Sequence, residues 1–124
     1  MIYIKSLRIG SYFHYDEKIF VLKKIEGDFV SGDRGRGDVK FNIGSIKPIP
    51  LTEQILLDLG FEKRDDDYCK KIGDYRFMVN LFENDISVQG SLEELIGFSF
   101  DKLELNKLQN IVYDISGKEL KFKN

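Results

Sequence analysis

Short apolar runs separated by polar turns fill the first part of the chain, up to a Pro-Ile-Pro segment. The runs lie at 11–15, 19–25, 29–32 and 38–41, and the turns between them carry Asp, Glu, Lys and Gly. Strands of this length, with turns every eight to twelve residues, are typical of a small barrel or sandwich. The pattern predicts an SH3-like small β-barrel over residues 1–50.

The Pro-Ile-Pro segment separates this pattern from a short helix. Pro48 and Pro50 favour an extended path for the residues that precede them. Thr52 is then a suitable helix N-cap, with Glu53 well placed in the first turn. Gly60 is in the usual position to end such a helix. A helix this short has to dock on other elements to be stable.

The chain then returns to alternating patterns. We expect strands at 67–72, 75–83, 86–89 and 95–100, with Asn84-Asp85 as a turn between the second and third. These segments alternate apolar and polar residues, and Gly, Asn or Asp separates the first three. They therefore predict an antiparallel sheet.

The last element is a helix over 104–117. Apolar residues recur there at three- and four-residue steps, and Gly117 ends the pattern. The fold class is therefore α+β. The expected domains are the barrel at 1–50 and an α+β subdomain at 51–124, which contains a short N-terminal helix, antiparallel strands and a C-terminal helix.

Composition limits the class of protein. The 124 residues are 42% hydrophobic and 32% charged, which is typical of a globular chain. The single cysteine excludes an internal disulfide, and no apolar run reaches the length of a signal peptide or a membrane span. We therefore expect a cytoplasmic protein without a membrane partner. The net charge of −2 disfavours a dedicated DNA-binding protein.

Charge is unevenly distributed. Residues 1–50 hold nine Lys and Arg against six Asp and Glu, whereas residues 51–124 hold ten against fifteen. The change coincides with the change of pattern and supports two subdomains.

Three blocks carry a resemblance to a known family: "LRIGS" at Leu7–Ser11, "PIPLTEQILLDLGF" at Pro48–Phe61 and "LQNIVYDISGKEL" at Leu108–Leu120. The chain resembles a family of small uncharacterised proteins of gut anaerobic bacteria, often encoded near prophage or conjugative-element genes, with the pattern LRIGN, PIPLTEEWLLKLGF and HQLQNLYFALTGEEL. Asn106 stands where that pattern has His. The resemblance implies a shared architecture and a mobile-element setting, and it implies no activity.

The segment "SGDRGRGDVKF", at 31–41, has the glycine content of a phosphate-binding loop. It lacks the Lys and the Ser or Thr that such a loop needs before a helix, and its Arg-Gly-Asp tripeptide has no extracellular context. The pattern predicts the tip of a hairpin, with three glycines that permit a tight turn. The alternative is a small basic finger formed by Arg34, Arg36 and Lys40.

Aromatic residues gather in the same part of the chain. Tyr3, Tyr12, Phe13 and Tyr15 could stack bases of single-stranded nucleic acid, or could simply be core residues at alternate positions. The candidate residues for contact with a partner or nucleic acid are Arg34, Arg36, Lys40, Tyr12 and Tyr15.

No catalytic or metal-binding residues are predicted. His14 has no ligand or nucleophile at a recognisable spacing, and Cys69 lies in an expected strand as a small apolar residue. Asp65, Asp66 and Asp67 lack the spacing of a calcium loop and are expected to form a solvated turn. We expect no cofactor.

Three functions stay open from the sequence. The first is a non-enzymatic binding module, an accessory protein of a phage or mobile element that recognises a protein partner. The second is nucleic-acid binding through the basic 33–41 loop and the barrel aromatics. The third is a structural or self-assembling protein.

Overall fold

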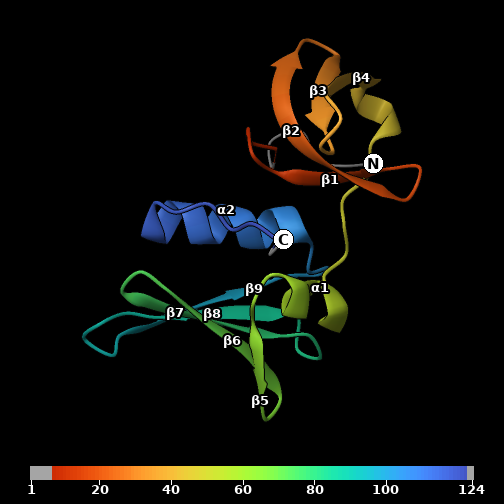
Figure 1. Cartoon of the computed structure of the whole chain (residues 1–124). Helices are drawn as coiled ribbons and strands as arrows, with labels where there is room; N and C mark the ends of the chain where they lie inside the picture. The colour runs from red at the N-terminus through yellow and green to blue at the C-terminus, as the bar shows by residue number, and fades with distance from the viewer. Residues whose placement is uncertain (1–6, 123–124) are drawn as a thin grey trace. The chain divides into compact units, whose positions relative to one another are not determined.

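The computed structural model describes residues 7–122 (Figure 1). The chain divides into two compact units. Unit 1 comprises Met1–Ile49 and Glu104–Asn110, and unit 2 comprises Pro50–Leu103 and Ile111–Asn124. Each unit contains one antiparallel sheet, of four and five strands respectively, so the predicted α+β class is confirmed.

The sheet of unit 1 contains all four strands expected from the alternating pattern. It has the order β1-β2-β3-β4, with every neighbouring pair antiparallel. Its strands are β1 (Tyr12–Tyr15), β2 (Lys18–Glu26), β3 (Phe29–Asp33) and β4 (Asp38–Asn42).

Two features modify this simple meander. The pairing of β2 with β3 shifts register between Leu22 and Lys24, which is a bulge in the long strand. After a 3₁₀ turn at Ile43–Ser45, the chain returns to β1, where His14 and Lys47 exchange two backbone hydrogen bonds of 2.8 and 2.9 Å. Among the described residues β1 and β4 do not pair with each other, so the named strands form an open sheet.

The core of unit 1 is aromatic. The ring of Phe13 stacks on Phe20 and meets Phe41 edge-on, with both centroid distances 5.7 Å, and Phe20 meets Phe41 at 4.9 Å. Gly32 in β3 faces this cluster, because a Cβ atom built on it would lie 2.5 Å from Cζ of Phe13. Leu7, Leu22, Val30 and Ile46 complete the cluster.

Unit 2 begins with helix α1, Glu53–Asp58. The Thr52 hydroxyl accepts a hydrogen bond from the Ile55 N–H at 3.2 Å, and Gly60 adopts φ 92° just beyond the helix. The predicted N-cap and stop signal are both confirmed.

The sheet of unit 2 has the order β5-β6-β7-β8-β9, again with all neighbours antiparallel. The four predicted strands are present. β7 ends before residue 83, because the side-chain oxygen of Asn80 accepts the Glu83 N–H at 2.9 Å and closes a turn at 81–84. The strands are β5 (Glu62–Arg64), β6 (Asp67–Ile72), β7 (Tyr75–Asn80), β8 (Asp85–Gln89) and β9 (Leu95–Ser99).

Helix α2, Leu105–Ser116, confirms the predicted C-terminal helix. Its first residues, up to Asn110, belong to unit 1, and the residues from Ile111 onward belong to unit 2. In the described part of the chain, no helix has the length and apolar character to span a membrane.

A buried glutamine of α2 completes the hydrogen bonding of β1 in unit 1. The Gln109 carboxamide accepts the Tyr12 N–H at 2.8 Å and donates to the Gly10 carbonyl at 3.0 Å. The Arg8 guanidinium donates to the Gln109 carbonyl and to the Asn110 side chain, each at 3.2 Å. Two of the sequence blocks behind the family resemblance therefore bond to each other, which gives them a structural role.

Candidate binding site

A cavity of about 270 Å³ opens in unit 1 between the β1–β2 turn and the tip of the β3–β4 hairpin. Phe20 and Phe41, 5% and 7% exposed, contribute apolar surface from the core, while Tyr15 and Val39 are 39% and 46% exposed. The Tyr15 ring leans on Phe41 at a centroid distance of 4.6 Å. We call this cavity the arginine pocket, and its lining residues are Tyr15, Asp16, Lys18, Phe20, Arg34, Arg36, Gly37, Val39 and Phe41.

Among the residues that line the arginine pocket, cations outnumber carboxylates. Lys18, Arg34 and Arg36 line it, against the single carboxylate of Asp16. The guanidinium carbon of Arg34 lies 5.9 Å from the ring centroid of Phe20, within cation–π range. An apolar group placed next to a carboxylate matches this combination of aromatic surface and positive charge.

The hairpin tip is shaped by an aspartate. The Asp33 carboxylate accepts the N–H groups of Gly35 at 2.7 Å and Arg36 at 3.1 Å. These hydrogen bonds, that of Gly35 above all, lower the pKa of Asp33. Gly35 and Gly37 have φ values of 95° and 94°, a conformation that favours glycine. The predicted hairpin tip is confirmed, and it places both arginines at the cavity.

Three of the five candidate binding residues line the arginine pocket, and two do not. Tyr15, Arg34 and Arg36 line the arginine pocket. Lys40 does not, because side chains alternate along β4, and its ammonium lies 4.6 Å from the ring centroid of Phe29 instead.

Tyr12 does not have the exposure expected of a contact residue. It is only 8% exposed, so its side chain offers little surface to a partner. Phe13 is fully buried, and Tyr3 lies outside the described residues. Among the three of these aromatics that the structure describes, Tyr15 is the one that is exposed.

Six lining residues were not among the candidates: Asp16, Lys18, Phe20, Gly37, Val39 and Phe41. Val39 and Phe41 share one face of β4, and Phe20 and Lys18 share one face of β2. The alternation of side chains along each strand predicts that Val39 lies beside Phe41 and Lys18 beside Phe20. That both pairs lie near the hairpin tip depends on the pairing of β2, β3 and β4.

His14 and Cys69 are placed as parts of strands. Burial lowers the pKa of the His14 imidazole, and the opposing effect of the Glu17 charge is smaller. Burial also raises the pKa of the half-buried Cys69 thiol, as does the charge of Asp67, with Arg64 and Arg76 opposing. Within residues 7–122, no three His, Cys, Asp or Glu side chains gather as a metal site would require.

The Cys69 environment predicts slow alkylation. At pH 8, iodoacetamide should react several-fold more slowly with the native protein than with the urea-unfolded chain, since the thiolate is the nucleophile. Because Cys69 is the only cysteine in the sequence, mass spectrometry of the whole chain reads out this one group. If the alkylation rate of the native protein reached half of its maximum at a pH below the usual thiol pKa of about 8.5, this expectation would be contradicted.

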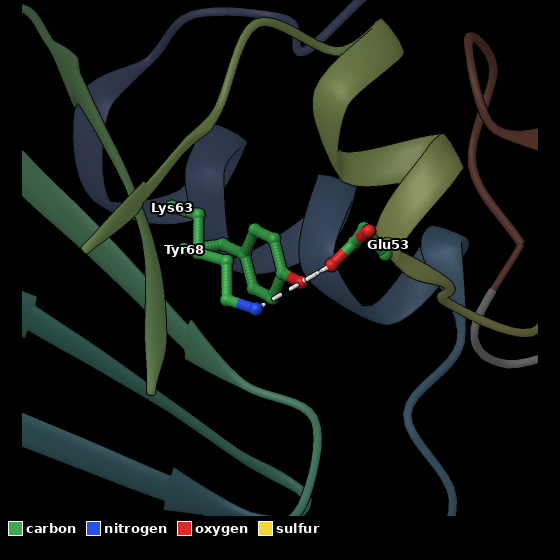
Figure 2. Close-up of polar contacts among 3 residues, drawn as sticks. All are labelled: Glu53, Lys63 and Tyr68. Carbon is green, nitrogen blue, oxygen red and sulfur yellow. Dashed lines mark hydrogen bonds and ion pairs between the residues drawn. The ribbon is translucent and has the colours of Figure 1, made fainter. Parts of the chain in front are cut away.

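A second polar cluster lies in unit 2 (Figure 2). The Tyr68 hydroxyl donates to the Glu53 carboxylate at the start of α1, and the Lys63 ammonium of β5 lies 3.8 Å from the same oxygen. The hydrogen bond to Glu53, followed by burial and the Glu53 charge, raises the pKa of Tyr68. Tyr68 therefore acts as a neutral donor that connects β6 to α1, which is a structural role.

Comparison of the chain with protein-family models, with curated proteins and with solved structures found no match. Its function is therefore inferred from its own geometry.

Proposed function

We propose that the chain is a non-enzymatic binding module whose arginine pocket takes an apolar side chain, flanked by carboxylates, from a protein partner. The observation that carries this proposal is the pocket itself, with exposed apolar surface from Tyr15 and Val39 next to the nearly buried rings of Phe20 and Phe41, and with cations from Lys18, Arg34 and Arg36. A volume of about 270 Å³ suits one large side chain better than an extended ligand.

We further propose that unit 1 is an SH3-like barrel. Four antiparallel strands, a 3₁₀ turn and a return of the chain to β1 at Lys47 are the order of elements that this architecture requires. The bulge in β2 supplies the bend that such a small barrel needs in a long strand. The arginine pocket then lies between two hairpin loops, where binding residues are often found.

Nucleic acid is the weaker candidate. Sequence-tolerant binding of single strands uses open aromatic faces on which successive bases stack. Phe20 and Phe41 are too buried to offer such faces, and Tyr15 alone provides one exposed ring at the pocket. The net charge of −2 also gives little general attraction for phosphates.

We propose that the chain has no catalytic activity. A nucleophile needs activation, and the raised pKa of Cys69 keeps its thiol protonated near neutral pH. The family resemblance adds a setting, in which the chain acts in the cytoplasm as an accessory protein of a phage or mobile element.

A fluorescent peptide tests the proposal. A peptide with a central Phe between Glu residues should bind, and replacement of its Phe by Ala or its Glu by Lys should each weaken binding at least about tenfold. Added salt should also weaken binding, because the charge pairs are exposed.

Two double variants that change the net charge by the same amount locate the binding site. Arg34→Glu with Arg36→Glu should abolish binding, whereas Lys23→Glu with Lys40→Glu, outside the pocket, should leave it within about twofold. Equal losses in both variants would reject the pocket as the site. Binding of an oligothymidine with a steep salt dependence, and no binding of the peptide, would favour the nucleic-acid alternative instead.

A further inference from the structure

Unit 2 exposes an aromatic side chain next to acidic residues. Phe82, in the turn between β7 and β8, is 91% exposed. Glu83 follows it directly, and Asp85 begins β8. The exposed phenylalanine ring is apolar area that contact with another surface would bury, with a favourable free energy.

The turn that carries Phe82 is well defined. The Glu83 N–H donates to the Asn80 side chain at 2.9 Å, and the Asn84 carbonyl accepts the Phe100 N–H at 3.0 Å. Asn84 itself adopts φ 55°, a conformation that asparagine tolerates in turns. A side chain presented on a fixed turn loses little additional backbone entropy when it binds.

We propose that the arginine pocket of one copy of this chain binds Phe82 of a second copy. The inference rests on the proposed function, because Phe82 with Glu83 and Asp85 has the chemistry assigned to the partner. The ring meets the exposed side chains of Tyr15 and Val39, and the two carboxylates meet Arg34, Arg36 and Lys18.

Charge complementarity supports a second copy as the occupant. Unit 1 contains ten Lys and Arg against seven Asp and Glu, while unit 2 contains nine against fourteen. Two copies that meet through unlike units bring opposite net charges together, which favours encounter.

The proposed contact joins two different surfaces. A contact of this type leaves a free pocket on one copy and a free Phe82 on the other, so it generates rings or open chains. The expected assembly therefore grows with concentration and does not stop at a symmetric dimer unless a ring closes.

The chain offers a matched control for Phe82. Leu92 lies in the β8–β9 loop of unit 2, is 87% exposed and is followed by Glu93 and Glu94. It has similar exposure and similar acidic neighbours, but it lacks an aromatic ring to pair with the pocket's rings and guanidinium groups.

Sedimentation from low micromolar to millimolar protein tests the proposal. The average mass of the native chain should rise with concentration and fall with salt. Phe82→Ala should weaken association at least about tenfold, and Leu92→Ala should leave it within about twofold. Association that persists in Phe82→Ala, or that is lost in Leu92→Ala, would overturn the proposal.

A mixing experiment identifies the two surfaces. Phe82→Ala keeps the pocket, and the Arg34→Glu, Arg36→Glu double variant keeps Phe82, so each should be monomeric alone. Together they should form dimers with one copy of each and nothing larger. A mixture that stays monomeric, while the native chain associates, would overturn the contact. All these substitutions are at exposed positions, and circular dichroism checks that each variant is folded.

The peptide experiment separates this inference from the proposed function. If the native chain binds the acidic Phe peptide but stays monomeric up to millimolar concentration, self-recognition is wrong and the pocket proposal stands. If it neither associates nor binds the peptide, both are wrong.

Discussion

Replacement of Gln109 by methionine is expected to lower the free energy of unfolding by about 2–5 kcal/mol, because it removes two buried hydrogen bonds to backbone groups. The carboxamide is fully buried, and it satisfies the Tyr12 N–H and the Gly10 carbonyl. Methionine has a similar length and volume, so the change tests hydrogen bonding more than packing. Urea denaturation followed by circular dichroism gives the free energy of unfolding.

The control is the same substitution on a solvent-facing helix position. Gln54 of α1 is exposed, and its side chain donates to Asp58 at 2.9 Å. Gln54→Met should change stability by no more than about 0.5 kcal/mol. A Gln109→Met protein as stable as the Gln54→Met protein would show that the buried carboxamide is not needed.

Gly32→Ala is expected to destabilise the protein by about 1–3 kcal/mol, through overpacking of the aromatic core of unit 1. The new methyl group would lie 2.5 Å from Cζ of Phe13 and 3.1 Å from Cβ of Phe20. A flexible side chain could move away from such a contact, but the Phe13 ring is fully buried and packed between Phe20 and Phe41. Thermal and urea unfolding measure the loss.

Two further variants establish the cause. Gly97→Ala, in strand β9, introduces a methyl group with nothing within 4 Å and should be nearly neutral. Phe13→Leu replaces the ring by a shorter side chain. Gly32→Ala should therefore lower the free energy of unfolding by less in the Phe13→Leu background than in the native protein. Additive effects of Gly32→Ala and Phe13→Leu would indicate that the contact with Phe13 is not the source of the strain.

The fold could be predicted best where local sequence patterns are strong. The four strands of unit 1, the Thr52 cap and helix α2 all follow from alternation, capping and helical periodicity. Strand β5 was missed, because its three residues are all charged and exposed and carry no apolar alternation. The end of β7 was misjudged, because the Asn80 side chain stops the strand while the apolar pattern continues.

The candidate site was only partly predictable. Arg34 and Arg36 were identified because a glycine-rich hairpin tip is visible in the sequence. The roles of Tyr12 and Tyr15 were not separated, although adjacent strand residues face opposite sides and these two differ by an odd number of positions. Phe20 and Phe41 join the site only through strand pairing, which no local pattern encodes.

The role of Gln109 could not be predicted from the sequence. This residue interrupts the polar–apolar order of α2, and a buried polar residue implies a hydrogen-bonding partner. That partner lies 97 residues earlier in the chain. Only the fold shows that the role of Gln109 is to bind β1.

The division of α2 between the units has a consequence for biosynthesis. A ribosome makes β1 to β4 first and Glu104–Asn110 only after every strand of unit 2. In the nascent first sheet, the Gly10 carbonyl and the Tyr12 N–H therefore stay without their bonds to Gln109 until all of unit 2's strands and residue 109 have been translated. Translation that stops before codon 109 yields a product in which neither half of the molecule has all of its segments.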